Sequence, residues 1–229
     1  MSYQAIEVRK VAGSLGAELT GLDLSRHLPP KAEQELRRAL TEHLVLFLRD
    51  QDLTLERLVE ITRVFGPVFR VPYVKHMEEH PDIIAVLKEA DERNISTFGN
   101  GWHSDFSFLE APPMGSVLYG KEIPPHGGDT IWANMYDAYE GLSGGMKRML
   151  DPLRAIQSGK PYGAASPPKN LRASRSIVME RNNPEADREI AHPVVVVHPA
   201  SGRKALFLNA IYTSRFEDMT EAESRPLAG

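Results

Sequence analysis

The spacing of apolar positions predicts two helices in the first third of the chain. Between Pro30 and His43, apolar residues fall on one side and charged residues on the others, which is typical of an amphipathic helix opened by a proline. Thr54 can cap a second helix with its hydroxyl, and Gly66 is expected to end that helix. Residues 44–48, between the two helices, are all apolar and indicate a short buried strand.

Shorter apolar runs predict strands in the rest of the chain. Residues 8–24 combine such runs with glycines, which indicates short strands and turns, and residues 83–87 form a further candidate strand. Between 102 and 132, apolar stretches alternate with Pro-Pro and Gly-Gly pairs, a pattern typical of antiparallel strands joined by turns. Two strands at 194–197 and 205–208 are expected to form a hairpin.

Three segments of the second half show other patterns. Residues 135–150 are predicted to be mostly helical, with an interruption at Gly144-Gly145. Thr220 begins a Thr-Glu-Ala-Glu capping box, which predicts the start of a helix. Residues 158–183 are rich in Ser, Gly, Pro, Lys and Arg and show little periodicity. We therefore expect this segment to be either a functional lid or a disordered surface loop.

The composition is that of an ordinary globular domain. The chain has 229 residues, of which 41% are hydrophobic and 25% charged, enough for one substantial core. Its net charge is -4 and the charges are interspersed, so it lacks the basic stripe that nucleic-acid binding needs. No apolar run approaches the roughly 20 residues that cross a bilayer, and no secretory signal is expected. Partners are thus expected to be small molecules, and homo-oligomers are compatible with the sequence.

The absence of cysteine restricts the chemistry of any metal site. Without Cys the chain can form neither disulfides nor thiolate metal sites. A bound metal must be held by His, Asp or Glu, and these ligands suit iron, manganese or zinc. The same absence fits a cytoplasmic protein.

The segment Trp102-His103-Ser104-Asp105 carries the candidate chemistry. On a strand, residues two apart point the same way, so His103 and Asp105 are expected to share one face. An imidazole and a carboxylate so placed can hold one face of an octahedral metal. A second His from a distant strand would complete the facial triad of non-haem Fe(II) oxygenases, with positions left open for a 2-oxo acid and dioxygen. A surface or hydrogen-bonded pair is the alternative for an isolated His-x-Asp.

Several ordered motifs resemble those of the taurine dioxygenase family, which includes herbicide-cleaving and alkylsulfatase members. The motifs are 21–24 (GLDL), 46–51 (LFLRDQ), 102–105 (WHSD), 112–113 (PP), 127–132 (GGDTIW) and 198–209 (HPASGRKALFLN). The resemblance runs from about Ile6 to the end of the chain. It is specific for the family and says little about the substrate.

The resemblance implies a fold and a set of cofactors. The fold is an α+β, mainly β double-stranded β-helix (a cupin-like jelly roll) with flanking helices, as a single dioxygenase domain over residues 1–229. The resemblance places Fe(II) on His103 and Asp105, and makes 2-oxoglutarate the co-substrate. Thr130 matches the position whose hydroxyl meets a carboxylate of 2-oxoglutarate, although a turn role is the alternative for this residue.

Other parts of the family pattern have no counterpart in the sequence. The third iron ligand of the family is a His near the C-terminus, and an Arg that binds the far carboxylate of 2-oxoglutarate follows it. We therefore expect the chain to lack the C-terminal portion of the domain, with the third ligand beyond residue 229, and to have little oxygenase activity by itself. Four residues near the hairpin are not assigned to these roles: His192, His198, Arg203 and Arg215.

The resemblance also bears on the substrate, which is oxidised while 2-oxoglutarate yields succinate and CO2. Sulfonates, alkyl sulfates and aryloxy acids are the substrate classes that the family suggests. Val71 and Val74 align with a His and a Tyr of taurine-cleaving members, and neither valine can form a hydrogen bond with a sulfonate or an amine. This favours a more apolar substrate, although Tyr73 and His76 lie one small alignment shift away. Tyr212 is predicted to face either the pocket or the core.

Three other interpretations compete with the oxygenase. Trp102 and Trp132 are expected to be core aromatic residues, and so do not distinguish between these interpretations. A catalytically incomplete β-helix module could bind a small molecule without metal. A zinc hydrolase could use His103, Asp105 and His198. A purely structural role would leave the Trp-His-x-Asp and Gly-Gly-Asp-Thr motifs unexplained.

Overall fold

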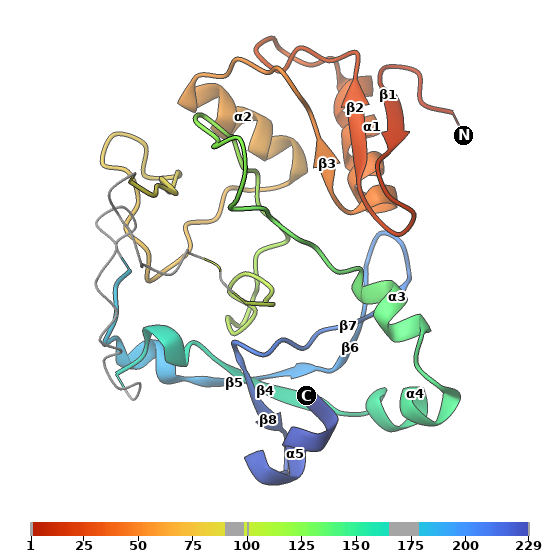
Figure 1. The fold of residues 1–229 in the computed structure, drawn as a ribbon, viewed down its shortest axis with the longest axis vertical. Coiled ribbons are helices and arrows are strands. Elements are labelled where there is room, and N and C mark those ends of the chain that lie inside the picture. The colour runs from red at the N-terminus through yellow and green to blue at the C-terminus, as the bar shows by residue number, and fades with distance from the viewer. Residues whose placement is uncertain (1, 90–98, 100, 165–178, 229) are drawn as a thin grey trace.

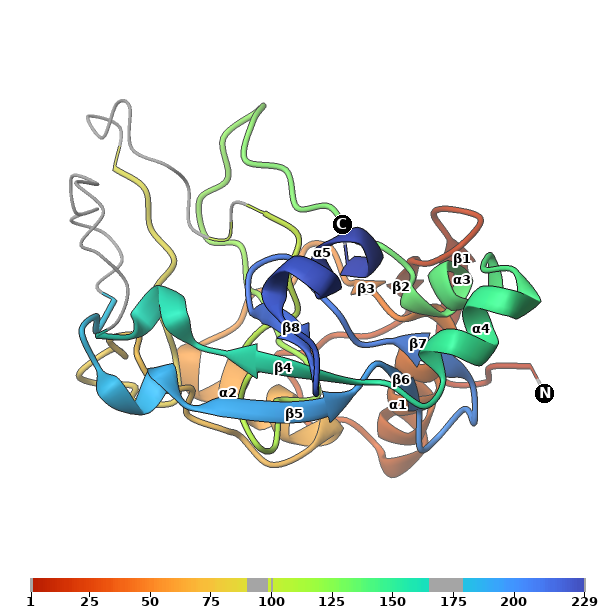
Figure 2. The same cartoon turned by 90° about the horizontal axis from the view of Figure 1, so that it is seen from below.

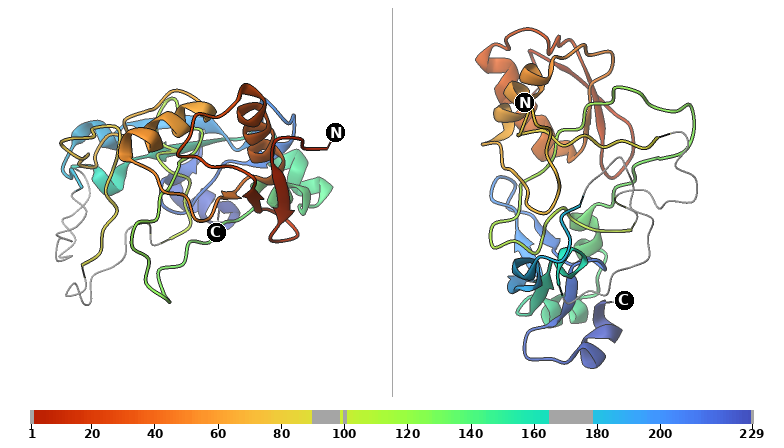
Figure 3. Two further views of the ribbon diagram at one scale, coloured as in Figure 1. Left: turned by 90° about the horizontal axis from the view of Figure 1, so that it is seen from above. Right: turned by 90° about the vertical axis from the view of Figure 1, so that its left-hand side faces the viewer.

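The computed structural model describes residues 2–89, 99, 101–164 and 179–228, and the statements below concern these residues (Figure 1). Two small layers of sheet and helix lie at opposite ends of the molecule, with an irregular segment between them (Figures 1 and 3). None of the helices in these ranges combines the length and the apolar character that crossing a bilayer requires.

The N-terminal layer is a three-stranded sheet packed against two helices. Its elements are β1 (Glu7–Lys10), β2 (Ala17–Thr20), α1 (Pro30–His43), β3 (Leu46–Phe47) and α2 (Leu55–Phe65). Strands β1 and β2 are antiparallel, and β3 runs parallel to β2. Their core contains Ala17 and Ala39, both fully buried, and Leu36, which is 1% exposed. Short strands are found in both predicted regions, 8–24 and 44–48, but β3 has only 2 residues and is half-buried, not buried as expected.

The two predicted N-terminal helices are also confirmed. Helix α1 spans Pro30–His43 as the apolar spacing predicts, with proline in its first turn. The hydroxyl of Thr54 accepts a hydrogen bond from the backbone N–H of Arg57 at 3.2 Å, which caps α2. Gly66 is the C-terminal cap of α2. Local sequence therefore determines both ends of α2.

The C-terminal layer is built on an antiparallel sheet of three strands in the order β5-β4-β8 (Figure 2). A separate hairpin, β6-β7, and several short helices surround this sheet. The elements are α3 (Met135–Glu140), α4 (Gly144–Leu150), β4 (Arg154–Ser158), η1 (Lys160–Tyr162), η2 (Pro184–Asp187), β5 (Glu189–Pro193), β6 (Val195–Val197), β7 (Lys204–Leu206), β8 (Thr213–Phe216) and α5 (Glu221–Ala228).

Three predictions for this layer are confirmed. Strands β6 and β7 pair antiparallel, with Val195 opposite Leu206, as expected for the hairpin. Thr220 and Glu223 cap α5 reciprocally, because each side chain accepts a hydrogen bond from the backbone N–H of the other. The helical region at 135–150 divides into α3 and α4, although Gly144 begins α4 and does not interrupt it.

The prediction of strands at 83–87 and 102–132 was wrong. Between α2 and α3, the described residues contain one isolated bridge, Val74 with Met179, and no strand. Residues 120–133 are all exposed, and Figure 2 shows this green segment projecting away from the sheets. A strand needs a neighbour to pair with its backbone, and the described residues offer this segment none.

The two tryptophans of the chain lie at the surface. Trp102 and Trp132 are 59% and 45% exposed, so neither is the core aromatic that was expected. Most of the segment 158–183, predicted as a lid or loop, lies outside the described residues, which resume at Met179.

Candidate active site

His103 and Asp105 converge, although they do not lie on a strand. Residues 105–108 form a turn, and Phe106 in its middle has a φ of 49°. The Nε2 atom of His103 lies 3.0 Å from Oδ1 of Asp105. The predicted juxtaposition is therefore found, but the turn produces it and the alternation of a strand does not.

Hydrogen bonds orient both side chains of this pair. Nδ1–H of His103 donates to the carbonyl oxygen of Gly101 at 2.8 Å, which directs Nε2 toward Asp105. The hydroxyl of Ser116 donates to the other carboxylate oxygen of Asp105 at 3.2 Å. The hydrogen bond with Asp105 raises the pKa of His103, and the same bond lowers the pKa of Asp105. The two groups therefore favour the charged ion pair when no metal separates them.

The donor chemistry of the His103–Asp105 pair fits a metal ion, and the separation of the two hydrogen-bonded atoms is compatible with one. Two neighbouring ligand atoms, each about 2.1 Å from an octahedral ion, are about 3.0 Å apart, because the angle between them is about 90°. That is the observed separation of Nε2 and Oδ1. A histidine that binds a metal commonly donates its other ring N–H to a backbone carbonyl, as His103 does to Gly101.

The described residues supply no third ligand of this kind. No group of three His, Cys, Asp or Glu side chains able to hold a metal occurs among them. The zinc site of His103, Asp105 and His198 is therefore wrong. Nδ1 of His198 instead accepts hydrogen bonds from the backbone N–H groups of Ala200 and Ser201, both at 3.3 Å, and this stabilises the β6-β7 turn.

The other basic residues near the hairpin have partners of their own. Nε2–H of His192 donates to the carbonyl oxygen of Leu109 at 2.9 Å. Arg203 contacts Asp137 at 3.5 Å, and Arg215 contacts Glu189 on β5 at 2.6 Å. Each of the three residues thus has a protein partner, in agreement with the expectation that none of them belongs to the iron or 2-oxoglutarate site.

Thr130 forms no hydrogen bond with His103 or Asp105. Thr130 is exposed, within the exposed stretch that precedes α3. Its side chain forms no hydrogen bond with any residue in the described ranges. Its role toward 2-oxoglutarate remains a prediction.

A buried cluster of aromatic rings borders His103, and we call it the aromatic wall. It consists of Phe106, Phe108, Tyr162 and Tyr212. The ring of Tyr212 meets that of His103 edge-on with 6.3 Å between centroids, and it lies 4.8 Å from that of Phe108. The hydroxyls of Tyr162 and Tyr212 are 3.3 Å apart. Burial raises the pKa of Tyr212, so its hydroxyl stays protonated.

All three residues predicted for the substrate pocket meet at the aromatic wall. Tyr212 is one of its members, Val74 packs in the same cluster with 3% exposure, and the half-buried Val71 packs against it. Sequence reasoning missed Tyr162 and gave no role to Phe106 and Phe108. The two phenylalanines follow Asp105 so closely that this short spacing was the available signal.

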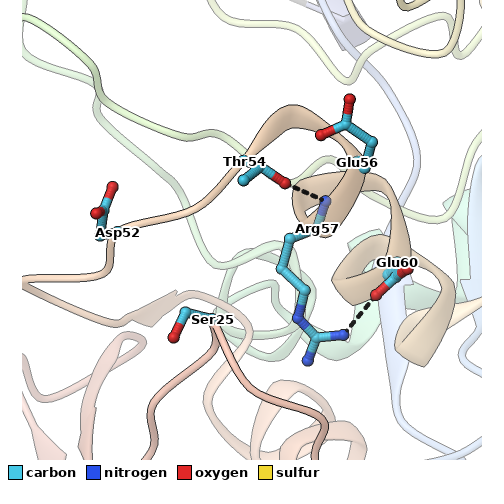
Figure 4. A pocket seen from close by; sticks show the side chains of 6 residues that line it. All are labelled: Ser25, Asp52, Thr54, Glu56, Arg57 and Glu60. Atoms are coloured by element: carbon cyan, nitrogen blue, oxygen red, sulfur yellow. Dashed lines mark hydrogen bonds and ion pairs between the residues drawn. The ribbon is translucent and has the colours of Figure 1, made fainter.

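A separate hollow lies at the start of α2, away from these residues in the sequence (Figure 4). Its lining is Ser25, Asp52, Thr54, Glu56, Arg57 and Glu60. Arg57 is already engaged there, because Nη1 contacts Glu60 at 2.7 Å and Nε donates to the carbonyl oxygen of Leu24 at 2.6 Å. The hollow therefore offers acidic side chains and no unengaged cation.

Replacing Gly159 with alanine should disturb the aromatic wall. A Cβ atom at this position would lie 2.5 Å from Cε2 of Phe108, which is too close for two carbon atoms. We expect the variant to lose about 1–3 kcal/mol of unfolding free energy in urea, as overpacked sites do. Gly145→Ala is the control, because its Cβ would have no neighbour nearer than 3.8 Å. Wild-type stability in Gly159→Ala would contradict this packing.

Comparison with known proteins places the chain in a family. The family described as "Taurine catabolism dioxygenase TauD, TfdA family" matches residues 7–228. The chain is 33% identical to an alkylsulfatase of Acinetobacter baylyi and 31% identical to an alpha-ketoglutarate-dependent sulfate ester dioxygenase of Pseudomonas putida. These alignments cover 98% and 97% of this chain, and 69% and 72% of the two relatives.

A solved structure has a similar fold. The chain superimposes on a taurine dioxygenase from Burkholderia xenovorans with a TM-score of 0.74 and 30% sequence identity. The match covers 98% of this chain and 71% of that structure. The helices and sheets of this chain are thus arranged as in that dioxygenase structure.

Sequence and fold together define the class of this protein as the 2-oxoglutarate-dependent non-haem iron dioxygenases. Within that class, the chain belongs to the taurine catabolism dioxygenase TauD, TfdA family. The cofactor of this family is Fe(II), and 2-oxoglutarate and dioxygen are its co-substrates. This result favours the enzyme over a binding module that holds no metal.

Proposed function

We propose that His103 and Asp105 are two of the three iron ligands of this dioxygenase. The observation that supports this is the 3.0 Å separation of Nε2 and Oδ1, with both groups oriented by further hydrogen bonds. The third ligand, a histidine, would come from outside the described residues. The surrounding fold would be a double-stranded β-helix, in agreement with the likeness to the taurine dioxygenase structure.

Thr130 is proposed to bind a carboxylate of 2-oxoglutarate through its hydroxyl. This rests on its place in the Gly-Gly-Asp-Thr motif at 127–130. Because Thr130 is exposed and has no hydrogen-bond partner among the described residues, its hydroxyl is available to a ligand.

The substrate proposed for this site is an alkyl sulfate, in preference to the sulfonate and aryloxy acid classes. The two relatives described above are named for sulfate esters. The aromatic wall and Val74 form one buried cluster beside the ring of His103, and Val71 packs against it, so the surroundings proposed for the alkyl chain are apolar. Neither valine can form a hydrogen bond with the amine of taurine.

The proposed reaction hydroxylates the carbon that carries the sulfate ester. Bound Fe(II), with 2-oxoglutarate and dioxygen, supplies the oxidation. Overall, one oxygen atom of dioxygen would end in the hydroxyl group of the substrate and the other in succinate, with release of CO2. The hydroxylated ester then separates into an aldehyde and sulfate. In this reaction the protein would hold the iron through His103 and Asp105 and exclude water with the aromatic wall. It would also orient one C–H bond of the substrate toward the iron.

We propose that the enzyme works in the cytoplasm on small molecules, without nucleic-acid or membrane partners. The absence of cysteine and the net charge of -4 support this assignment.

A series of alkyl sulfates tests the substrate assignment. If the chain of the substrate lies on the aromatic wall, each added methylene should raise kcat/KM about fourfold between ethyl and hexyl sulfate, since burying one CH2 contributes about 0.8 kcal/mol. The measurements, made on protein that includes the third iron ligand, are sulfate release and succinate formation in the presence of Fe(II), 2-oxoglutarate and air. Taurine is the comparison substrate and should be turned over more slowly than hexyl sulfate. A flat series, or faster turnover of taurine, would contradict the proposal.

A further inference from the structure

A buried hydrogen-bonded serine follows the proposed iron ligands. Ser107 lies two residues after Asp105 and is 0% exposed. Its hydroxyl donates to the side-chain carbonyl of Gln157 on β4, which is also 0% exposed. It accepts a hydrogen bond from the amide nitrogen of Asn209 at 2.8 Å. One hydroxyl thus joins the ligand turn to β4 and to the loop between β7 and β8.

Asn209 shapes the loop that touches His103. Its side-chain oxygen accepts hydrogen bonds from the backbone N–H groups of Ile211, at 3.2 Å, and of Tyr212, at 2.9 Å. Tyr212 meets the His103 ring edge-on. Ile211 lies so close to Gly101 that a Cβ on that glycine would be 3.1 Å from Cδ1 of Ile211.

The same loop therefore contacts both members of the bond that orients the imidazole. Gly101 supplies the carbonyl oxygen that accepts Nδ1–H of His103. Ile211 packs on that glycine, and Tyr212 packs on that histidine. A shift of the loop would move the carbonyl and the ring together.

The other end of the network is anchored on the backbone. The amide nitrogen of Gln157 donates to the carbonyl oxygen of Phe207 at 3.2 Å. Every polar side chain of the network thus has partners, which buried amides and hydroxyls require. Satisfied buried networks of this kind fix one arrangement of the elements they join.

We propose that Ser107, Gln157 and Asn209 form a positioning network that holds His103 and Asp105 in the geometry that binds the metal. The inference rests on the proposed function, in which those two residues are iron ligands. None of the three network residues is a proposed iron ligand, so they are positioning residues and not catalytic ones.

Metal affinity measured without turnover tests this inference. Mn(II), which is stable in air, would be titrated into the metal-free full chain, with free Mn(II) followed by electron paramagnetic resonance. Ser107→Ala should raise the Kd for Mn(II) by about 10- to 100-fold, the usual effect of removing a partner that orients a ligand. Asn209→Asp should do the same, because it keeps an acceptor for the loop but cannot donate to Ser107. It also keeps the test decisive if Ser107→Ala does not fold.

Ser224→Ala is the matched control. Ser224 is 2% exposed, and its hydroxyl accepts from the N–H of Phe216 at 2.9 Å and donates to the carbonyl of Thr220 at 2.8 Å. The Ser224→Ala variant thus loses a comparable pair of buried hydrogen bonds outside the network, and its Kd for Mn(II) should equal that of the wild type. If Ser224→Ala weakens Mn(II) binding as much as Ser107→Ala, or if both network variants bind like the wild type, the inference is overturned.

His103→Ala separates the inference from the proposed function. Loss of saturable Mn(II) binding in this variant supports the ligand assignment, whatever the network variants do. If His103→Ala binds Mn(II) as tightly as the wild type, the ligand assignment fails and the inference fails with it.

Discussion

In the enzyme with all three iron ligands, replacing His103 with alanine is expected to abolish retention of Fe(II) and, with it, the oxidation of 2-oxoglutarate. The imidazole supplies the Nε2 atom that lies 3.0 Å from Asp105, so alanine leaves one carboxylate of the proposed pair. Because a partner that only orients a ligand is worth about 10- to 100-fold, loss of a direct ligand should cost more than about 100-fold. Iron bound per chain after anaerobic reconstitution, and succinate formed per minute, measure the two effects.

His198→Ala is the control for the His103 variant. It removes an imidazole of the same size from the β6-β7 turn, where Nδ1 accepts hydrogen bonds from Ala200 and Ser201. Its iron content should equal that of the wild type. Equal iron retention by His103→Ala and His198→Ala would show that the iron lies elsewhere.

Replacing Phe216 with alanine is expected to cause the largest loss of stability. Phe216 is 0% exposed on β8, opposite Ala155 of β4, and packs in one core cluster with Leu150 and Val194. A fully buried Phe replaced by Ala usually costs about 3–5 kcal/mol, because contacts are lost and a cavity remains. Urea unfolding should show a lower midpoint with an unchanged slope.

Val197→Ala is the comparison for the Phe216 variant. Val197 is also on a strand, β6, but is 59% exposed. Its unfolding free energy should stay within about 0.5 kcal/mol of the wild type. A loss below about 1 kcal/mol in Phe216→Ala would mean that this cluster is not the core of the C-terminal layer.

Segments with strong local signals could be predicted from the sequence. The helices α1 and α2 follow from apolar spacing, Pro30 and the Thr54 cap, which act within a few residues. The β6-β7 hairpin follows from two apolar runs joined by a short turn. For the same reason, Thr220 and Glu223 identified the start of α5.

The central sheet of the C-terminal layer could not be predicted in this way. Strand β4 has the sequence Arg-Ala-Ile-Gln-Ser, in which Gln157 and Ser158 are as buried as Ala155. After the exposed Arg154, the other four residues of β4 are all buried, and a strand buried on both faces shows no alternation of apolar and polar residues. The polar side chains are tolerated because distant residues supply their hydrogen bonds, as Ser107 and Phe207 do for Gln157.

The sequence by itself determined the family, the two candidate ligands and the helices with clear caps, because each motif and each cap depends on residues that are close together in the chain. Only the tertiary structure decided how His103 and Asp105 meet, since a turn and not a strand brings them together. It also decided which distant residues contact Phe106 and Ser107 in that turn. Tyr162, Gln157 and Asn209 lie about 50 or more residues further along the chain, and contacts of that range depend on packing of the whole fold.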